Sequence, residues 1–139
     1  MIILDTNVIS ALMRSEPDPV VVRWLDGLPP ESLWTTAITV FEVRLGLEIL
    51  AAGRRRRLLE AAFETALVED FEGRVLAFDQ AAAHAAGRMA AERRRSGRTV
   101  EIRGLQIAGI ALARKSAVAT RNLRHFAGLG LKLLDPWAR

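Results

Sequence analysis

The chain has 139 residues, which corresponds to a single domain spanning residues 1–139, because domains usually hold about 100–200 residues. Half of the residues are hydrophobic and 26% are charged, so the chain is globular rather than disordered. It has no cysteine, which excludes a disulfide framework, a thiolate zinc site and a cysteine nucleophile.

The positive charges are almost all arginine. The net charge of +4 comes from 20 Lys and Arg residues against 16 Asp and Glu residues, and only Lys115 and Lys132 are lysines. Because arginine binds phosphates and carboxylates through its planar fork, this balance favours a nucleic-acid or acidic partner. No apolar run reaches the roughly 18 residues of a membrane span, and no basic segment precedes the first apolar run, so we expect no membrane contact and no secretory signal. Together with the lack of cysteine, this favours a cytoplasmic location.

Strand-like and helical segments alternate along the chain. Short apolar runs bounded by turn residues predict strands, and amphipathic stretches bounded by caps, Gly or Pro predict helices. In chain order, the predicted elements are a strand at 2–4, helices at 8–14 and 20–28, a strand at 33–36, helices at 38–52 and 54–66, a strand at 74–78, helices at 79–95 and 102–114, and strands at 117–120 and 131–134. This alternation predicts an α/β fold with a parallel sheet that helices cover on both faces. Ligands of such sheets bind beyond the carboxyl ends of the strands.

The first candidate at this edge is Asp5, which follows the first predicted strand. Its position alone favours a helix cap, since Asp and Asn are common there. Thr6 and Asn7 can satisfy that cap, however, which leaves Asp5 available for a ligand.

Glu42 is the second candidate. It shares a helical face with the apolar stripe of Ile38, Leu45, Gly46 and Ile49. A carboxylate that points toward the core is costly unless it is paired or binds a metal ion. Two interpretations therefore stay open, an ion pair with one of the arginines and a metal ligand.

Further polar residues follow the other strands. Asp79 opens the helix at 79–95 and is interpreted as its cap. Asn122 comes after the fourth strand, where a turn role is the default and weak metal coordination or water orientation the alternative. In the buried helix at 102–114, Gly104 costs up to about 1 kcal/mol relative to alanine and supplies no side chain. Glu101 lies one turn earlier on the same face, if the helix extends that far.

The remaining charged and aromatic features have structural interpretations. Arg54–Arg57 begin a helix, where cations are unfavourable, and are interpreted as a solvated charge run. Arg93–Arg95 complement a helix C-terminus. His84 and His125 lie far apart with no third neighbour at zinc-ligand spacing. Trp137 is expected to pack or to close an interface rather than to bind RNA.

Taken together, these residues resemble the PIN-domain family, and within it the FitB-like branch of the VapC-type toxins of bacterial toxin–antitoxin pairs. The resemblance covers essentially the whole chain. The motifs that carry it are Ile2-Ile3-Leu4-Asp5-Thr6-Asn7-Val8, Ile38-Thr39-Val40-Phe41-Glu42-Val43-Arg44-Leu45-Gly46, Phe78-Asp79, Leu105-Gln106-Ile107-Ala108, Ala119-Thr120-Arg121-Asn122 and Pro136-Trp137.

The resemblance implies a three-layer α/β/α sandwich with a parallel five-stranded sheet, and an endoribonuclease that uses Mg²⁺ or Mn²⁺. It makes Asp5 a metal ligand and Glu42 a second acid that binds the metal or its water, with Thr6, Asn7 and Thr120 in support. Carboxylate oxygens are the ligands that such hard cations prefer. It also implies an RNA substrate, a homodimer, a higher toxin–antitoxin assembly, and a cognate antitoxin whose tail covers the pocket.

The chain departs from the family pattern at two acidic positions. The third acid of the family falls at Gly104, and the fourth, which varies within the family, falls at Asn122. The loss at Gly104 predicts an impaired nuclease, unless Glu101 reaches into the gap. The alternative function is a non-catalytic protein of the same fold that dimerises and engages an antitoxin or RNA without cleavage.

Overall fold

The computed structural model describes residues 1–138, which form one parallel five-stranded sheet. The strands are β1 (Ile2–Leu4), β2 (Leu33–Thr36), β3 (Val75–Leu76), β4 (Ala117–Ala119) and β5 (Leu133–Leu134). Their order across the sheet is β3-β2-β1-β4-β5, and every neighbouring pair is parallel. All five predicted strands are present, although β3 and β5 are shorter than the sequence predicts. The strand β1 lies at the centre, and its chain direction brings Asp5 to the carboxyl edge.

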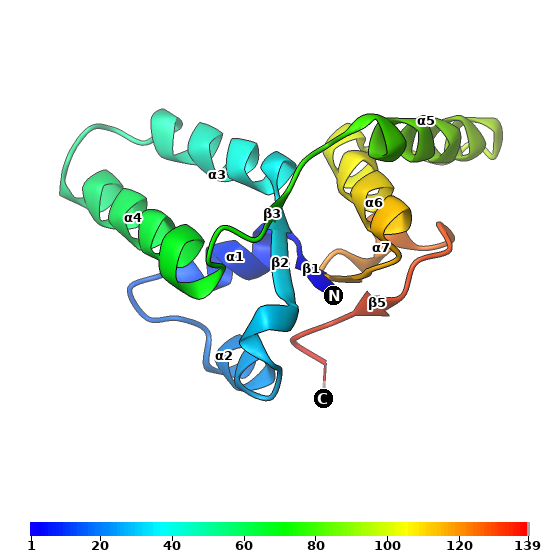
Figure 1. Cartoon of the computed structure of the whole chain (residues 1–139). Helices are drawn as coiled ribbons and strands as arrows, with labels where there is room; N and C mark the ends of the chain where they lie inside the picture. Colours follow the sequence, from blue (N-terminus) through cyan, green and yellow to red (C-terminus); the bar gives the residue numbers. More distant parts are fainter. Residues whose placement is uncertain (139) are drawn as a thin grey trace.

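The helices follow the predicted order (Figure 1). They are α1 (Thr6–Met13), α2 (Pro19–Asp26), α3 (Ala37–Ile49), α4 (Arg54–Thr65), α5 (Gln80–Arg95), α6 (Ile102–Arg114) and α7 (Leu123–Phe126). A 3₁₀ turn at Pro30–Ser32 and a π-helical turn at Ala66–Asp70 complete the described structure. The sequence does not predict α7, because four residues are too few for a visible hydrophobic period.

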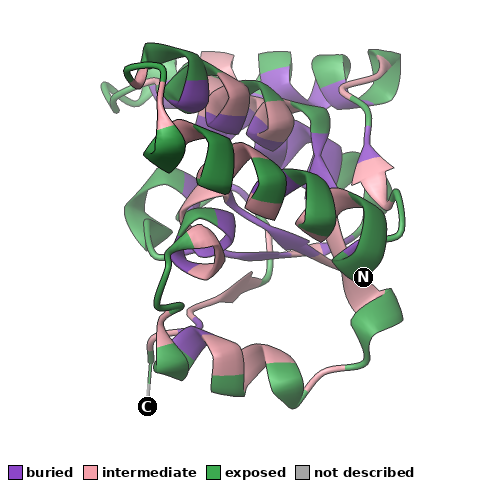
Figure 2. Ribbon diagram, turned by 90° about the vertical axis from the view of Figure 1, so that its left-hand side faces the viewer, coloured by how far each residue is buried: buried purple, intermediate pink, exposed green. Residues whose placement is uncertain are grey.

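Helices cover both faces of the sheet, which confirms the three-layer α/β/α architecture. One face packs against α5, α6 and α7, with Ile3 and Val118 contributed by the strands. The other face packs against α1, α2, α3 and α4, with Leu4 and Ala119 contributed by the strands. Successive strand residues point to opposite faces, so β1, β2, β4 and β5 each contribute residues to both core clusters. Figure 1 shows the two groups of helices on either side of the sheet, and Figure 2 shows the buried residues gathered around it.

The helices α5 and α6 approach each other closely at Gly109. A Cβ atom added there would lie 2.4 Å from the carbonyl oxygen of Ala82 and 2.8 Å from the Cβ of Ala86. These distances leave no room for a side chain, so Gly109 permits the close packing of the two helices.

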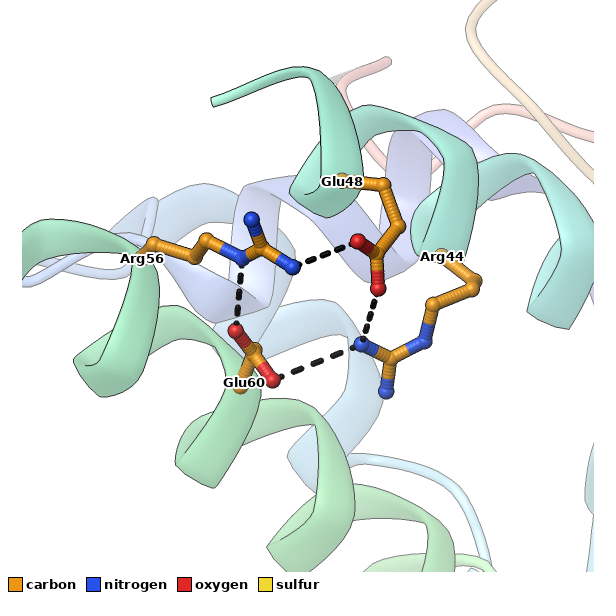
Figure 3. Close-up of polar contacts among 4 residues, drawn as sticks. All are labelled: Arg44, Glu48, Arg56 and Glu60. Carbon is orange, nitrogen blue, oxygen red and sulfur yellow. Dashed lines mark hydrogen bonds and ion pairs between the residues drawn. The ribbon is translucent and has the colours of Figure 1, made fainter. Parts of the chain in front are cut away.

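The predicted charge run at Arg54–Arg57 is not wholly solvated. Arg56 lies between Glu48 of α3 and Glu60 of α4, and its Nε donates to Glu60 at 2.9 Å. Arg44 closes the cluster, at 3.6 Å from Glu48 and 3.4 Å from Glu60 (Figure 3). This ion-pair cluster joins α3 to α4. The charge of Arg56 is therefore balanced by glutamates of the same chain, and no acidic partner molecule is needed to explain it.

Arg93 also differs from the sequence interpretation. It is buried, and its guanidinium donates to the carbonyl oxygens of Arg124, His125 and Ala127. The side chain therefore binds the carboxyl end of α7 rather than complementing its own helix. This interaction fixes the segment that carries His125 against α5.

Among residues 1–138, no helix is long and apolar enough to cross a membrane.

Candidate active site

A cavity of about 440 Å³ lies at the carboxyl edge of the sheet. It is bounded by the residues that follow β1 and β4, by α3, and by the start of α6. Its lining includes Asp5, Glu42, Glu101, Gly104 and Asn122. The structure therefore brings together the acidic candidates and both positions at which the chain departs from the family pattern.

Asp5 is held rigidly at the floor of this cavity. Only 7% of the residue is exposed. Its Oδ1 accepts from the backbone N–H of Thr6 at 2.8 Å, and its Oδ2 accepts from the hydroxyl of Thr120 at 2.8 Å and from Asn7 Nδ2 at 3.3 Å. The prediction that Thr6 and Asn7 would cap the first helix is wrong, because α1 begins at Thr6 and Asp5 itself is the cap. Capping and ligand binding are compatible, since each carboxylate oxygen has two lone pairs.

The electrostatic environment of Asp5 is unusual for a cap. Burial raises the pKa of this carboxyl above its ordinary value, and the nearby Glu42 charge raises it further. The hydrogen bonds from Thr120 and Thr6 and the proximity of His125 act in the opposite direction without cancelling the effect. A buried carboxylate beside a second acid, in a cavity, is typical of a functional site that gains a cation.

Glu42 reaches the same cavity from α3. Its Oε1 accepts from the hydroxyl of Thr6 at 2.8 Å, and its Oε2 lies 3.5 Å from Arg103 NH1. Thr6 therefore links the two acids, since its N–H binds Asp5 and its hydroxyl binds Glu42. Both interpretations of Glu42 are partly realised, because it has an arginine partner and also faces the cavity with 23% of its side chain exposed.

The apolar stripe that first drew attention to Glu42 faces the core only at Ile38, which packs against the core cluster on the α5 and α6 side of the sheet. Leu45 is 37% exposed and Ile49 is 74% exposed. The buried residues of α3 are Thr39, Val43 and Leu47 instead. Glu42 directly precedes Val43 and is partly buried, so it lies at the edge of this buried face.

The helix α6 begins at Ile102, and Glu101 is its N-cap. The Glu101 carboxylate accepts from the backbone N–H of Gly104. A Cβ atom built on Gly104 would lie 2.7 Å from Glu101 Oε2 and 3.8 Å from the Cβ of His125. The Glu101 carboxylate thus occupies the space that a side chain at position 104 would need.

Glu101 acts as a helix cap in this arrangement. Residues 1–138 contain no group of three or more His, Cys, Asp or Glu side chains placed to hold a metal ion. The carboxylate lines the cavity but is engaged as a helix cap.

Of the other predicted residues, Thr120 and Asn122 lie at the site, whereas Asp79 does not. Thr120 is fully buried, and its hydroxyl donates to Asp5 and accepts from the backbone N–H of Asn122 at 2.9 Å. Asn122 is exposed at the cavity, with its side chain directed to no hydrogen-bond partner in the described residues. Asp79 caps α5 by accepting from Ala82 N–H at 2.9 Å, as predicted, and does not line the cavity.

Sequence reasoning did not place three arginines and one histidine near the acids. Arg14, Arg121 and His125 line the cavity, and Arg103 pairs with Glu42. Arg121 and His125 follow β4 in the sequence and so lie near its carboxyl end. Their positions in the chain could therefore have predicted that they lie near the site. Nothing local to Arg103 predicts its ion pair, which depends on how α6 packs against α3.

The donors at the site fit a hard divalent cation. Asp5, Glu42, Thr6 and Asn122 offer carboxylate, hydroxyl and amide oxygen atoms, the ligand type that such a cation prefers. Mg²⁺ is commonly held by one or two carboxylates, and water and substrate phosphates complete its shell. Two carboxylates therefore suffice for a weakly held ion of this type.

Comparisons with known proteins find relatives in sequence and in structure. A sequence model of the PIN domain matches residues 2–130. The chain is 39% identical over 137 residues to the VapC ribonuclease Y4jK of Sinorhizobium fredii, covering 99% of this chain and 98% of that protein. It is 35% identical to the toxin FitB of Neisseria gonorrhoeae over 137 residues, with 99% of both chains covered. The crystal structure of FitAcB from the same organism superimposes with a TM-score of 0.90 at 34% identity, covering 100% of both chains.

Proposed function

The chain belongs to the PIN domain family and, within it, to the VapC-type toxin ribonucleases, and from this premise we propose that it is a metal-dependent endoribonuclease that cleaves RNA phosphodiesters. The observation that carries the proposal is the pair of acids Asp5 and Glu42, which face one cavity and are joined through Thr6.

Asp5 and Glu42 would hold Mg²⁺ or Mn²⁺. Such an ion supplies an activated water molecule and stabilises negative charge on the phosphate. Asp5 is oriented for this by Thr120 and Asn7, and Glu42 by Thr6. Asn122 orients water at the open side of the cavity.

The site is expected to be weak, because position 104 supplies no acid. Glu101 is the residue best placed to compensate, since its carboxylate already occupies the space beside Gly104. Only Oε2 of this carboxylate accepts from the N–H of Gly104, so its remaining lone pairs would be available to a metal ion.

Cleavage of a pool of total RNA by the purified protein, with Mn²⁺, with Mg²⁺ and with EDTA, tests the proposal. Cleavage should require the metal and should be lost in Asp5→Asn and in Glu42→Gln. Asp26→Asn is the matched control, because Asp26 is exposed at the end of α2 and does not line the cavity. Cleavage that survives Asp5→Asn would refute the proposal.

A non-catalytic binding protein of the same fold is the second candidate function. The lack of a three-acid cluster within residues 1–138 favours it. In that case the protein would cleave no RNA with any metal, and Asp5→Asn would leave its partner affinity unchanged.

We propose that the protein binds a cognate antitoxin. We also propose that it acts in the cytoplasm, as a homodimer or within a higher toxin–antitoxin assembly. The similarity to the FitB toxin supports the first, since a cell that makes a toxin needs a neutralising partner. The exposed apolar residues Phe41, Leu45 and Ile49 on α3 support a protein–protein interface. Light scattering coupled to size-exclusion chromatography would give the oligomeric state, and a monomer at all concentrations would contradict the homodimer.

A further inference from the structure

Arg121 lies at the mouth of the candidate active site. It directly follows Thr120, whose hydroxyl binds Asp5 at 2.8 Å, and its own backbone N–H donates to Asn7 Oδ1 at 3.2 Å. Thr120 and Asn7 both donate hydrogen bonds to Asp5, and Asn7 also accepts from the backbone of Arg121. These contacts fix the backbone of Arg121 relative to Asp5.

The side chain of Arg121 is supported by Trp137. Its guanidinium carbon lies 4.8 Å from the centre of the indole ring. The ring is itself anchored, since the indole N–H donates to Asp18 Oδ2 at 2.9 Å and the backbone N–H of Trp137 donates to Asp135 Oδ1 at 2.9 Å. Trp137 also packs against the core cluster on the α1 side of the sheet, as the sequence predicts. The stack therefore holds the guanidinium over a surface that cannot easily move.

The donors of the Arg121 guanidinium remain available. Within residues 1–138 this group forms no ion pair with a carboxylate, whereas Arg56 pairs with two carboxylates and Arg103 with one. A guanidinium that stacks on an aromatic ring has its N–H groups in its own plane, pointing away from the ring. There they can donate to the oxygens of a phosphate.

The charge pattern of the cavity explains why such a group is needed. Without a bound cation, Asp5 and Glu42 repel the phosphates of an RNA strand, and positive charge on the rim of the cavity offsets this repulsion. Arg14 and Arg121 line the same cavity and supply that charge. Of these, Arg121 is the one that an aromatic ring orients.

We propose that Arg121, stacked on Trp137, binds a phosphate of the RNA strand adjacent to the one being cleaved and so positions the strand over Asp5 and Glu42. Trp137 is a positioning residue that acts through Arg121. This inference rests on the proposed nuclease function for the identity of the ligand, but the phosphate site itself is defined by the stack and the free guanidinium.

Binding of fluorescein-labelled, mixed-sequence single-stranded RNA without metal, measured by fluorescence anisotropy over a range of salt, tests the inference. Removing the interaction with one phosphate of a single strand should reduce the salt slope by about 0.7 and the affinity by about fivefold at about 0.1 M salt. We expect this reduction in Arg121→Ala, a smaller one in Arg121→Lys, and an intermediate one in Trp137→Leu. Arg57→Ala is the matched control, since Arg57 is exposed on α4 and does not line the cavity.

Kinetics with Mn²⁺ give a second readout. The Arg121→Ala variant should raise KM by the same factor as it weakens binding and should change kcat much less. Circular dichroism melting confirms that each variant is folded. Affinity and salt slope of Arg121→Ala equal to those of Arg57→Ala would overturn the inference.

The two proposals can fail separately. If the wild-type protein and Asp5→Asn cleave equally, or if neither cleaves, the nuclease function fails. If Arg121→Ala still has reduced RNA affinity in that case, the phosphate site stands. If the wild-type protein cleaves RNA and Arg121→Ala has unchanged affinity and KM, only the inference about Arg121 fails.

Discussion

Replacing Gly104 by aspartate is expected to strengthen divalent-metal binding and to accelerate RNA cleavage. The position is buried in the first turn of α6 and faces the cavity that holds Asp5 and Glu42. A Cβ there would lie 2.7 Å from Glu101 Oε2, so Glu101 must move. The atom that must move is the end of a flexible side chain on an exposed residue, and the substitution therefore requires no backbone shift.

The helix contributions to the stability of the metal-free protein should change little. Loss of the Glu101 cap costs about 0.5–2 kcal/mol. A carboxylate in the first turn of a helix returns about 0.3–1 kcal/mol through the helix dipole, and the helix propensity of aspartate exceeds that of glycine by a few tenths of a kcal/mol. These contributions cancel to within about 1 kcal/mol, so any larger loss of stability in the metal-free protein would report repulsion between the new carboxylate and those of Asp5 and Glu42.

The effect on metal binding should be larger. Removing even an outer-shell partner of a metal ligand typically costs roughly 10- to 100-fold in affinity, so a new carboxylate beside Asp5 and Glu42 should gain at least as much. That gain corresponds to about 1.4–2.7 kcal/mol. Isothermal titration calorimetry with Mn²⁺ measures the affinity, and cleavage of total RNA measures the rate.

The Gly104→Ala variant is the decisive control, because it displaces Glu101 without adding a carboxylate. Mn²⁺ affinity of Gly104→Asp no higher than that of Gly104→Ala would refute the reasoning. If the wild type already matches Gly104→Asp and Glu101→Gln abolishes both binding and cleavage, Glu101 supplies the third acid.

Three further substitutions test the site and its support. In the metal-free protein, the free energy of unfolding should fall as pH rises from the ordinary carboxyl range through the raised pKa of Asp5, because the folded state there keeps a proton that the unfolded state has released. Urea melts in EDTA at several pH values should show this fall in the wild type and not in Asp5→Asn, and identical profiles would contradict the burial argument. Thr120→Val removes the 2.8 Å hydrogen bond to the buried carboxylate, so it should raise the pKa of Asp5 further and cost about 1–3 kcal/mol by denaturant unfolding; an unchanged midpoint would count against that hydrogen bond. Gly109→Ala places a Cβ 2.4 Å from the Ala82 carbonyl oxygen, and it should lower stability by about 1–3 kcal/mol. Gly87→Ala is its control, since a Cβ on that exposed helical glycine meets nothing within 4 Å, and equal effects of the two substitutions would contradict the close packing.

Local sequence patterns were enough to predict the architecture. The strand–helix alternation, the breakers and the cap at Asp79 depend on residues a few positions apart, so they are visible along the chain. The same holds for the placement of Asp5 at the carboxyl edge of β1. Short elements such as α7 escape this reasoning because they are held by tertiary interactions, here the guanidinium of Arg93.

Helical periodicity located Glu42 but misjudged its surroundings. The most apolar stripe of α3 is exposed at Leu45 and Ile49, while Thr39 is buried. Hydropathy cannot distinguish a stripe that faces the core from one that is left for a partner, because both are apolar.

The amino-acid sequence by itself determined the α/β fold, the family and the acids that follow its first strand and lie on its third helix. Only the tertiary structure decided that Glu101 caps α6 beside Gly104, that Arg103 pairs with Glu42, and that Arg121 stacks on Trp137. The physical reason is the range of the interactions. Strands, helices and caps are decided by neighbours a few residues apart, whereas these side-chain interactions depend on how whole elements pack around the end of the sheet.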